Sequence, residues 1–225
     1  MMCDERLFGP QIEAFGPARP VSCIDIGGAE TMEELAAHVL VEAPETFALA
    51  GLSMGGIVAM EVLRQAPAPL TGLALLDTNP LAERAEVAAN RGPQMEKARR
   101  GDLYAVMRDE MKPNYLAQGG RREEVLGLCM DMAMDLGPEV FCRQSFALRN
   151  RPDQTETLAR CSVPTLVLCG REDGLCPVER HEFMHGLIQS SILTIIEGAG
   201  HMPTLEKPQD TKTALNLWLR KIDNG

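Results

Sequence analysis

The chain has 225 residues and a formal net charge of −10 at pH 7, and 45% of its residues are hydrophobic and 24% charged. This length fits one domain, or one domain with an insertion, and the composition is that of a globular protein rather than a disordered one. The acidic excess argues against nucleic acid or an anionic membrane surface as a partner. We find no apolar run of about 18 residues that could span a bilayer, and no secretory signal peptide in the first 20 residues.

The cysteines indicate a reducing environment. There are seven, an odd number, and none forms a C-x-x-C pair. A disulfide framework and a zinc ribbon are therefore disfavoured, and free thiols in the cytoplasm are expected.

Short apolar runs alternate with helical patterns along the chain. The runs that predict buried strands are 21–26, 46–50, 73–76, 165–169 and 192–196. The segments that predict helices are 31–41, 54–65, 178–187 and 210–221. Continuous apolar runs are typical of parallel strands that are covered on both faces. The alternation predicts an α/β fold with a doubly wound, mostly parallel sheet.

Residues 81–155 depart from this pattern. They contain no predicted strand, are punctuated by pairs such as Gly-Pro at 92–93 and 137–138, and hold 12 basic and 12 acidic residues. We therefore expect a core of residues 1–80 and 156–225 with a helical insertion at 81–155. The basic and acidic residues of the insertion are mixed along the sequence, so its composition indicates no anion specificity.

A serine stands where a strand is predicted to turn into a helix. Gly51-Leu52-Ser53-Met54-Gly55 is a G-x-S-x-G sequence, and in that context it predicts a nucleophile elbow. The positions two before and two after the serine are expected to be small, so that strand and helix can approach each other. The Met54 N–H is expected to point to the place where an oxyanion would form. The alternative is a glycine-rich turn with a serine N-cap.

An acid and a base follow two later strands. Asp173 lies in the turn after 165–169, and His201 lies in the turn after 192–196. Carboxyl ends of parallel strands meet at one edge of a sheet, which brings these turns toward Ser53. A serine hydroxyl needs such a base, and the base needs an orienting acid.

With these three turns the chain resembles the α/β-hydrolase superfamily, of the small capped esterase and lactonase kind. The motifs GLSMGG, GREDGLCP and GAGHMP match its nucleophile, acid and histidine turns. The resemblance implies that the catalytic residues are Ser53, Asp173 and His201, that no cofactor or metal is needed, and that the substrate is a small ester or lactone. It also implies that 81–155 is a cap over the serine. The methionines and aromatic residues of the cap, among them Met95, Met107, Met111, Met132 and Tyr115, are expected either to shape an apolar pocket or to pack the cap on the sheet. Arg143, Gln144 and Ser145 are candidate substrate contacts from their location alone.

Other acids compete with Asp173. Glu172 is its neighbour, and Asp77 follows the strand at 73–76, where some members of the family place the acid. The G-x-x-D-x-x-x-P setting of Asp173 favours Asp173 over both.

A literal H-E-x-x-H runs from His181 to His185 and could bind zinc on a helix. We discount it, because this helix lies between two predicted parallel strands, where both histidines are expected on an exposed face.

The sheet of the family normally has three strands before the one predicted at 21–26, and one of them precedes the loop that provides the second oxyanion N–H. The chain begins near that point, so these strands are expected to be absent from it. Met1 is the nearest match to the second donor.

The sequence thus predicts a serine hydrolase. The alternatives are a related chemistry on the same fold (perhydrolase or haloperoxidase-like, C–C hydrolase or acyl transferase) and a truncated, non-catalytic domain that binds a ligand or a partner. The sequence does not indicate an oligomeric state.

Overall fold

The computed structural model describes residues 1–119 and 121–224. Its strands are β1 (Phe47–Leu52), β2 (Leu70–Leu76), β3 (Thr165–Gly170) and β4 (Ser191–Ile196). Its α-helices are α1 (Gly9–Phe15), α2 (Met32–Glu42), α3 (Met54–Gln65), α4 (Ala85–Lys97), α5 (Leu103–Ala105), α6 (Arg122–Arg149), α7 (Thr155–Ala159), α8 (Val178–Leu187), α9 (Pro203–Glu206) and α10 (Pro208–Asp223). Short helical turns are η1 (Glu5–Phe8), η2 (Ala98–Asp102), η3 (Val106–Met111) and η4 (Lys112–Asn114). No described helix is long and apolar enough to cross a membrane.

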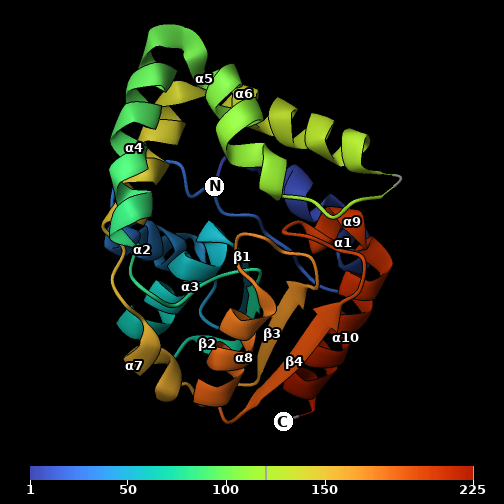
Figure 1. Ribbon diagram of the computed structural model, residues 1–225. Coiled ribbons are helices and arrows are strands. Elements are labelled where there is room, and N and C mark those ends of the chain that lie inside the picture. The colour runs from blue at the N-terminus through green and yellow to red at the C-terminus, as the bar shows by residue number, and fades with distance from the viewer. Residues whose placement is uncertain (120, 225) are drawn as a thin grey trace.

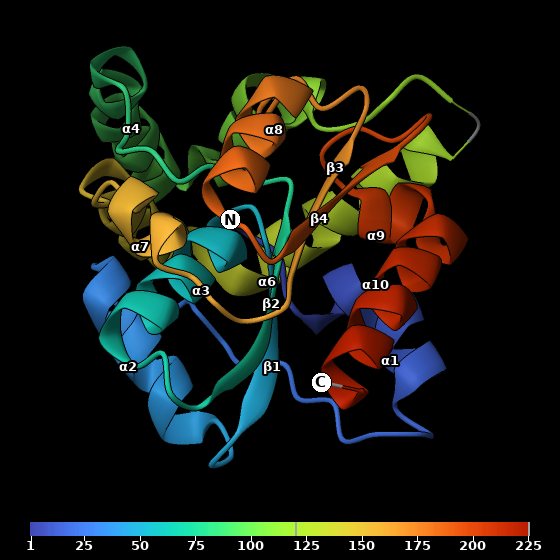
Figure 2. The ribbon, with the colours of Figure 1, turned by 90° about the horizontal axis from the view of Figure 1, so that it is seen from below.

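The four strands form one parallel sheet in the order β1-β2-β3-β4. Helices α2, α3 and α8 pack on one face, and α1 and α10 on the other, as Figure 2 shows with the sheet nearly edge-on. Every residue of β3 is buried, as expected for a strand covered on both faces. The predicted α/β fold with a parallel, doubly wound sheet is confirmed.

The segment 21–26 is not a strand, contrary to the prediction. Within the described residues, β1 pairs with β2 alone, and Val21 is 42% exposed. The carbonyl oxygens of Ile26 and Gly27 accept hydrogen bonds from the Gln144 and Arg143 side chains instead of from a neighbouring strand. An apolar run becomes a strand only where another strand supplies its hydrogen bonds, and no described strand pairs with this run.

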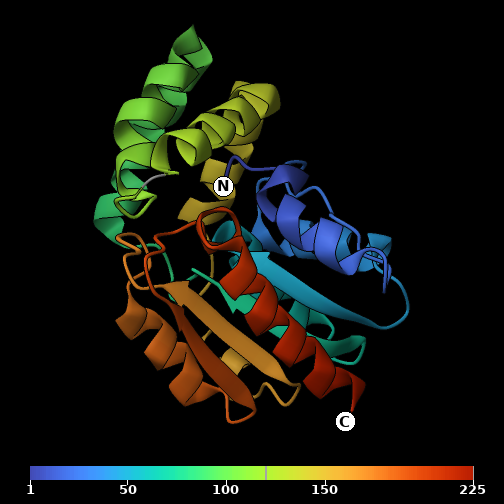
Figure 3. The same ribbon diagram turned by 90° about the vertical axis from the view of Figure 1, so that its right-hand side faces the viewer.

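The described residues of 81–155 are helical or irregular, and they lie above the carboxyl ends of the strands (Figures 1 and 3). The longest helix, α6, bends at Gly137, whose φ is +77°, and Pro138 follows it. This is one of the Gly-Pro pairs that the sequence marked as a break. The division into a core and a cap stays a prediction.

Candidate active site

Ser53 occupies a strained turn between β1 and α3. Its φ is +53° and its ψ is −115°, a backbone conformation that residues other than glycine rarely adopt. The Ser53 N–H donates to the Leu76 carbonyl oxygen at 2.8 Å, and the Ser53 carbonyl oxygen accepts from the Thr78 hydroxyl at 2.7 Å. The end of β2 therefore holds the turn in its strained form, as a nucleophile elbow requires.

The glycines around Ser53 are not equivalent. A Cβ on Gly51 would lie 2.2 Å from the Gly55 oxygen, and a Cβ on Gly56 would lie 2.7 Å from Thr78. A Cβ on Gly55 would have no heavy atom within 4 Å. The expectation that the position two after the serine must be small is therefore wrong, because the helix residue that closely approaches Thr78, in the segment after β2, is Gly56 and not Gly55.

His201 and Asp173 form a buried pair. Nδ1 of His201 lies 2.8 Å from Oδ2 of Asp173, and the two residues are 2% and 4% exposed. Oδ1 of Asp173 accepts the N–H groups of Leu175 and Cys176 at 2.8 and 3.0 Å. Burial raises the pKa of Asp173, but the charge of His201, their hydrogen bond and these two N–H groups outweigh burial and lower it.

Ser53 and His201 line the same cavity of about 370 Å³. The turn that follows Asp173 contributes Gly174, Leu175 and Cys176 to the wall of this cavity. The structure thus brings together the three turns that the sequence predicted to meet at the carboxyl edge of the sheet.

Two residues that the sequence did not assign to the site brace the His201 loop. Glu206 accepts backbone N–H groups from Ala117, Gly200 and Met202, at 2.8 to 3.1 Å. The backbone carbonyl oxygen of Tyr115 accepts the backbone N–H of His201 at 2.6 Å, and the Tyr115 ring lies edge-on to the imidazole. Glu206 lies five residues after His201, and this proximity in sequence could have suggested its role. Tyr115 lies in the insertion, and only the tertiary structure brings it next to His201.

Asp77 directly follows β2 in a fully buried position but makes no hydrogen bond to His201. Its Oδ1 accepts the Gly170 N–H at 2.9 Å, and its Oδ2 has no hydrogen-bond partner among the described residues. Burial, followed by the charge of Asp173, raises the pKa of Asp77 well above its usual range. Glu172, the other competitor, is exposed.

The H-E-x-x-H sequence lies on α8, but its two histidines have different environments. His181 is fully buried, which corrects the expectation of an exposed face for this residue, while His185 is exposed. Nε2 of His181 accepts the Thr78 N–H at 3.1 Å, and its Nδ1 lies 3.2 Å from the Pro177 oxygen. Both ring nitrogens of His181 are thus occupied by backbone groups, so the motif does not offer a pair of free zinc ligands.

Within the described residues, one group of side chains has the spacing of metal ligands, namely Asp173, Cys176 and His201. The Nδ1 atom of His201 is already hydrogen-bonded to Asp173, and burial raises the pKa of the Cys176 thiol. A protonated thiol and an occupied imidazole nitrogen make a poor metal site.

The two residues expected at an oxyanion site are Met54, which follows Ser53 in the chain, and Met1, which lines the same cavity. Met54 is the first residue of α3, so the helix itself does not use its N–H. Met1 lines the same cavity as Ser53, and burial lowers the pKa of its amine. The Met2 N–H donates to Oε1 of Gln144 at 2.7 Å.

The side chains expected to face substrate from α6 have other roles. Arg143 and Gln144 hold the backbone of residues 26 and 27, and Ser145 is fully buried. Of the methionines and aromatic residues singled out in the insertion, Met111 and Tyr115 line the cavity, while Met95, Met107 and Met132 are core residues.

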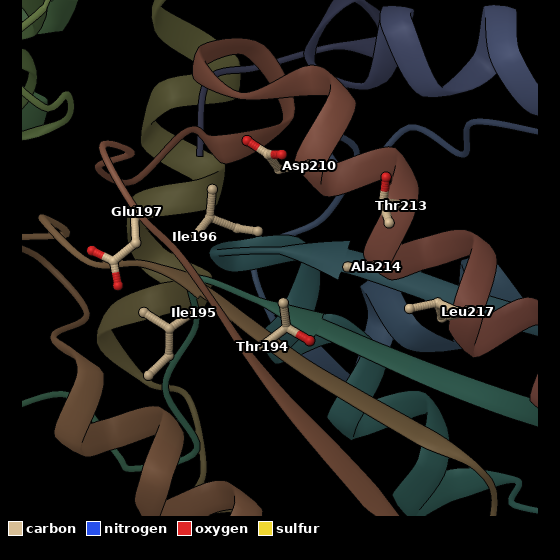
Figure 4. Close-up of a pocket in the computed structure, with 8 residues that line it drawn as sticks. All are labelled: Thr194, Ile195, Ile196, Glu197, Asp210, Thr213, Ala214 and Leu217. Atoms are coloured by element: carbon tan, nitrogen blue, oxygen red, sulfur yellow. The ribbon is translucent and has the colours of Figure 1, made fainter.

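A second groove, of about 390 Å³, lies between β4 and α10 (Figure 4). It is lined by Thr194, Ile195, Ile196, Glu197, Asp210, Thr213, Ala214 and Leu217. None of the three proposed catalytic side chains reaches it, so the cavity at Ser53 is the candidate active site.

Residues 8–214 match the sequence model of the alpha/beta hydrolase family. An esterase from Thermogutta terrifontis, solved with malate bound, is 30% identical with a TM-score of 0.87, over 98% of this chain and 86% of that one. The chain therefore belongs to the alpha/beta hydrolase family. An enol-lactonase from Burkholderia xenovorans superimposes with a TM-score of 0.84 at 20% identity, over 97% of this chain and 88% of that one.

Curated relatives match at lower identity. The biotin biosynthesis bifunctional protein BioHC of Teredinibacter turnerae is 24% identical over 93% of this chain, which spans 41% of that protein. The pimeloyl-[acyl-carrier protein] methyl ester esterase of Aliivibrio salmonicida is 22% identical over 87% of this chain and 77% of its own length.

Proposed function

We propose that the protein is a serine hydrolase that cleaves a small carboxylic ester or lactone through an acyl-enzyme on Ser53. The observation that carries this proposal is the buried His201–Asp173 hydrogen bond of 2.8 Å, at the cavity that Ser53 also lines. Ser53 itself is held in the strained conformation of a nucleophile elbow. Relatives named as esterases and as an enol-lactonase support the reaction class.

Each residue has a defined part in this mechanism. Asp173 holds Nδ1 of His201, which fixes the tautomer and leaves Nε2 to accept the Ser53 proton. Oγ of Ser53 then forms a bond to the carbonyl carbon of the substrate, and the Met54 N–H stabilises the resulting oxyanion. His201 returns the proton to the leaving alkoxide, which departs as an alcohol or, from a lactone, stays attached to the acyl chain. Water, deprotonated by His201, then releases the acid and restores Ser53.

The second oxyanion donor is assigned to Met1 as a prediction. Loss of one oxyanion donor costs roughly 10²–10³-fold in rate. The mechanism requires no cofactor. We also propose a reducing compartment such as the cytoplasm, because all seven cysteines are free thiols.

The test is Ser53→Ala, with exposed Ser162→Ala as the matched control. We expect Ser53→Ala to lower turnover of p-nitrophenyl valerate by more than about 10³-fold and to abolish labelling by a fluorophosphonate probe. Ser162→Ala should keep both. Turnover retained in Ser53→Ala would remove Ser53 from its role, and failure of the wild type to label would favour the non-catalytic alternative.

A further inference from the structure

The cavity at Ser53 is rich in arginine, although the chain as a whole is strongly acidic. Its charged lining residues, besides His201, are Glu83, Arg84, Arg91, Glu110, Arg151 and Arg180. Four guanidinium groups therefore face two carboxylates in a protein with a net charge of −10. An excess of one sign in a cleft concentrates ligands of the opposite sign.

One carboxylate in the wall serves two arginines. Glu83 lies 2.5 Å from Nε of Arg91 and 2.7 Å from Nη1 of Arg151, and each of these side chains is at most 9% exposed. Burial is the main cause that lowers the pKa of Arg151; the charge of Glu83 raises this pKa, and the charge of Arg91 lowers it further. This buried cluster is thus short of one negative charge, and a buried cation without a counter-charge is costly.

The remaining acid of the wall is already paired. Glu110 lies 2.6 Å from Nζ of Lys97, which does not line the cavity. Arg84 and Arg180 make no ion pair with any described residue. The positive excess of the cavity is therefore not cancelled by neighbouring side chains.

The two buried arginines keep donors free for a ligand. Arg91 uses Nε for Glu83 and Nη1 for the Met1 sulfur, and Arg151 uses Nε for the Leu81 oxygen and Nη1 for Glu83. The Nη2 groups of both arginines have no hydrogen-bond partner among the described residues. Guanidinium groups with free N–H donors are suited to a carboxylate, which can accept two hydrogen bonds at once.

We propose that the substrate carries a second, free carboxylate, as in the half-ester of a dicarboxylic acid or a carboxylated lactone, and that Arg91 and Arg151 bind this group with Arg180 nearby. This inference rests on the proposed function and names the substrate class of the same site. The binding energy of the carboxylate would hold the scissile carbonyl at Ser53, which is how a remote group of a substrate contributes to its turnover.

The test compares two esters of equal chain length, p-nitrophenyl hydrogen glutarate and p-nitrophenyl valerate. We expect the wild type to have the higher kcat/KM for the glutarate ester. Arg151→Gln and Arg180→Gln should each lower the glutarate-to-valerate ratio by about 10-fold or more, the effect of losing a hydrogen bond to a charged group. Because both substrates are measured on one protein, the ratio cancels any loss of folded enzyme.

Arg160→Gln is the matched control, since Arg160 is 78% exposed, pairs with Glu156 and does not line the cavity. Its ratio should equal that of the wild type. Equal rates for the two esters on the wild type, or an unchanged ratio in both Arg151→Gln and Arg180→Gln, would overturn the proposal even if Ser53→Ala had abolished turnover.

A binding measurement separates this inference from the proposed function. On Ser53→Ala, calorimetry should detect methyl hydrogen glutarate but not dimethyl glutarate, and Arg151→Gln should remove the signal. Binding of this kind without turnover of any ester would leave the carboxylate site standing and reject the hydrolase. Absence of binding, or stronger competition by inorganic phosphate than by glutarate, would reject the carboxylate assignment.

Discussion

Asp173 and Asp77 are neighbouring buried carboxyl groups whose pKa values the structure moves in opposite directions. Asp173 is hydrogen-bonded to His201, and its pKa is lowered. Asp77 lies at the end of the adjacent strand, near the charge of Asp173, and its pKa is raised by burial and by that charge. Two adjacent buried carboxyl groups do not ionise equally, so the one that contacts the histidine keeps the negative charge.

The first prediction concerns Asp77→Asn. A raised pKa in the folded state means that stability is greatest below the unfolded pKa, about 3.9, and falls as the pH rises toward the folded value. Asparagine keeps an oxygen for the Gly170 N–H and carries no charge, so the variant should gain Tm relative to the wild type between pH 4 and pH 8. Thermal unfolding across this range measures the gain. Exposed Asp131→Asn is the control, and a parallel pH profile for Asp77→Asn and the wild type would contradict the prediction.

Asp173→Asn should behave in the opposite way. A lowered folded pKa contributes stability that is present above the unfolded value and is lost as the pH falls through the folded value. The variant is therefore expected to be less stable than the wild type at pH 7.5, with a smaller difference below about pH 4. Its esterase kcat should also fall by about 10⁴-fold because the imidazole loses its orienting charge, whereas Asp77→Asn should keep its activity. Comparison of kcat in the two variants decides which aspartate is the catalytic acid.

The third prediction uses the two histidines of α8. Burial lowers the pKa of His181 to about 4, so the unfolded state binds the extra proton between about pH 6.5 and that value. Stability should therefore fall on acidification over this interval by at most about 1.4 kcal/mol per pH unit from this group. Urea unfolding of His181→Gln should lack that slope but show lower stability at pH 7.5, because the Thr78 and Pro177 contacts are disturbed. His185→Gln, the control, should retain this pH dependence. If the H-E-x-x-H sequence binds no zinc, a chelator should leave the Tm of the wild type unchanged.

Glycine substitutions around Ser53 give a fourth prediction. Gly51→Ala and Gly56→Ala each place a methyl group under 3.0 Å from other atoms, and each should destabilise the protein by about 1–3 kcal/mol. Gly55→Ala meets nothing and lies within α3, so it should be neutral or should stabilise by up to about 1 kcal/mol. Differences in Tm of about 2–4 °C per kcal/mol are measurable by calorimetry. A Gly55→Ala variant as unstable as Gly51→Ala would show that the motif constrains the position for another reason.

Glu206→Gln supplies the fifth. The amide oxygen can replace only part of the carboxylate that accepts N–H groups from three residues, so at least one buried donor loses its partner at a cost of about 1–3 kcal/mol. Because these contacts hold the His201 loop, kcat should fall by about 10-fold or more while KM changes little. Glu197→Gln, at an exposed pair with Arg171, should change neither stability nor kcat measurably. A Glu206→Gln variant that lost stability but kept kcat would make Glu206 purely structural.

Local patterns in the sequence were enough to predict most of the core. Helix α3 begins at Met54 and ends at Gln65 as predicted, and β3 extends the predicted run by one residue. Both follow from contacts within or next to the segment, such as apolar periodicity and continuous burial. The order of the serine, acid and histidine turns along the chain placed them at one edge of the sheet, because parallel strands end on the same side.

Other features depended on contacts between distant segments. The run at 21–26 has the composition of a strand, but strand formation needs a hydrogen-bonded neighbour, which no local pattern reveals. The mixed charges of 81–155 gave no sign of a basic cavity, since only folding brings Arg91 and Arg151 to one carboxylate and Arg180 to the same wall. Sequence alone thus determined which side chains are the candidate catalytic groups and on which turns they lie. Which of two aspartates meets the histidine, and which charges remain uncancelled around the serine, was decided by tertiary packing, because electrostatic energies depend on distance and burial rather than on position along the chain.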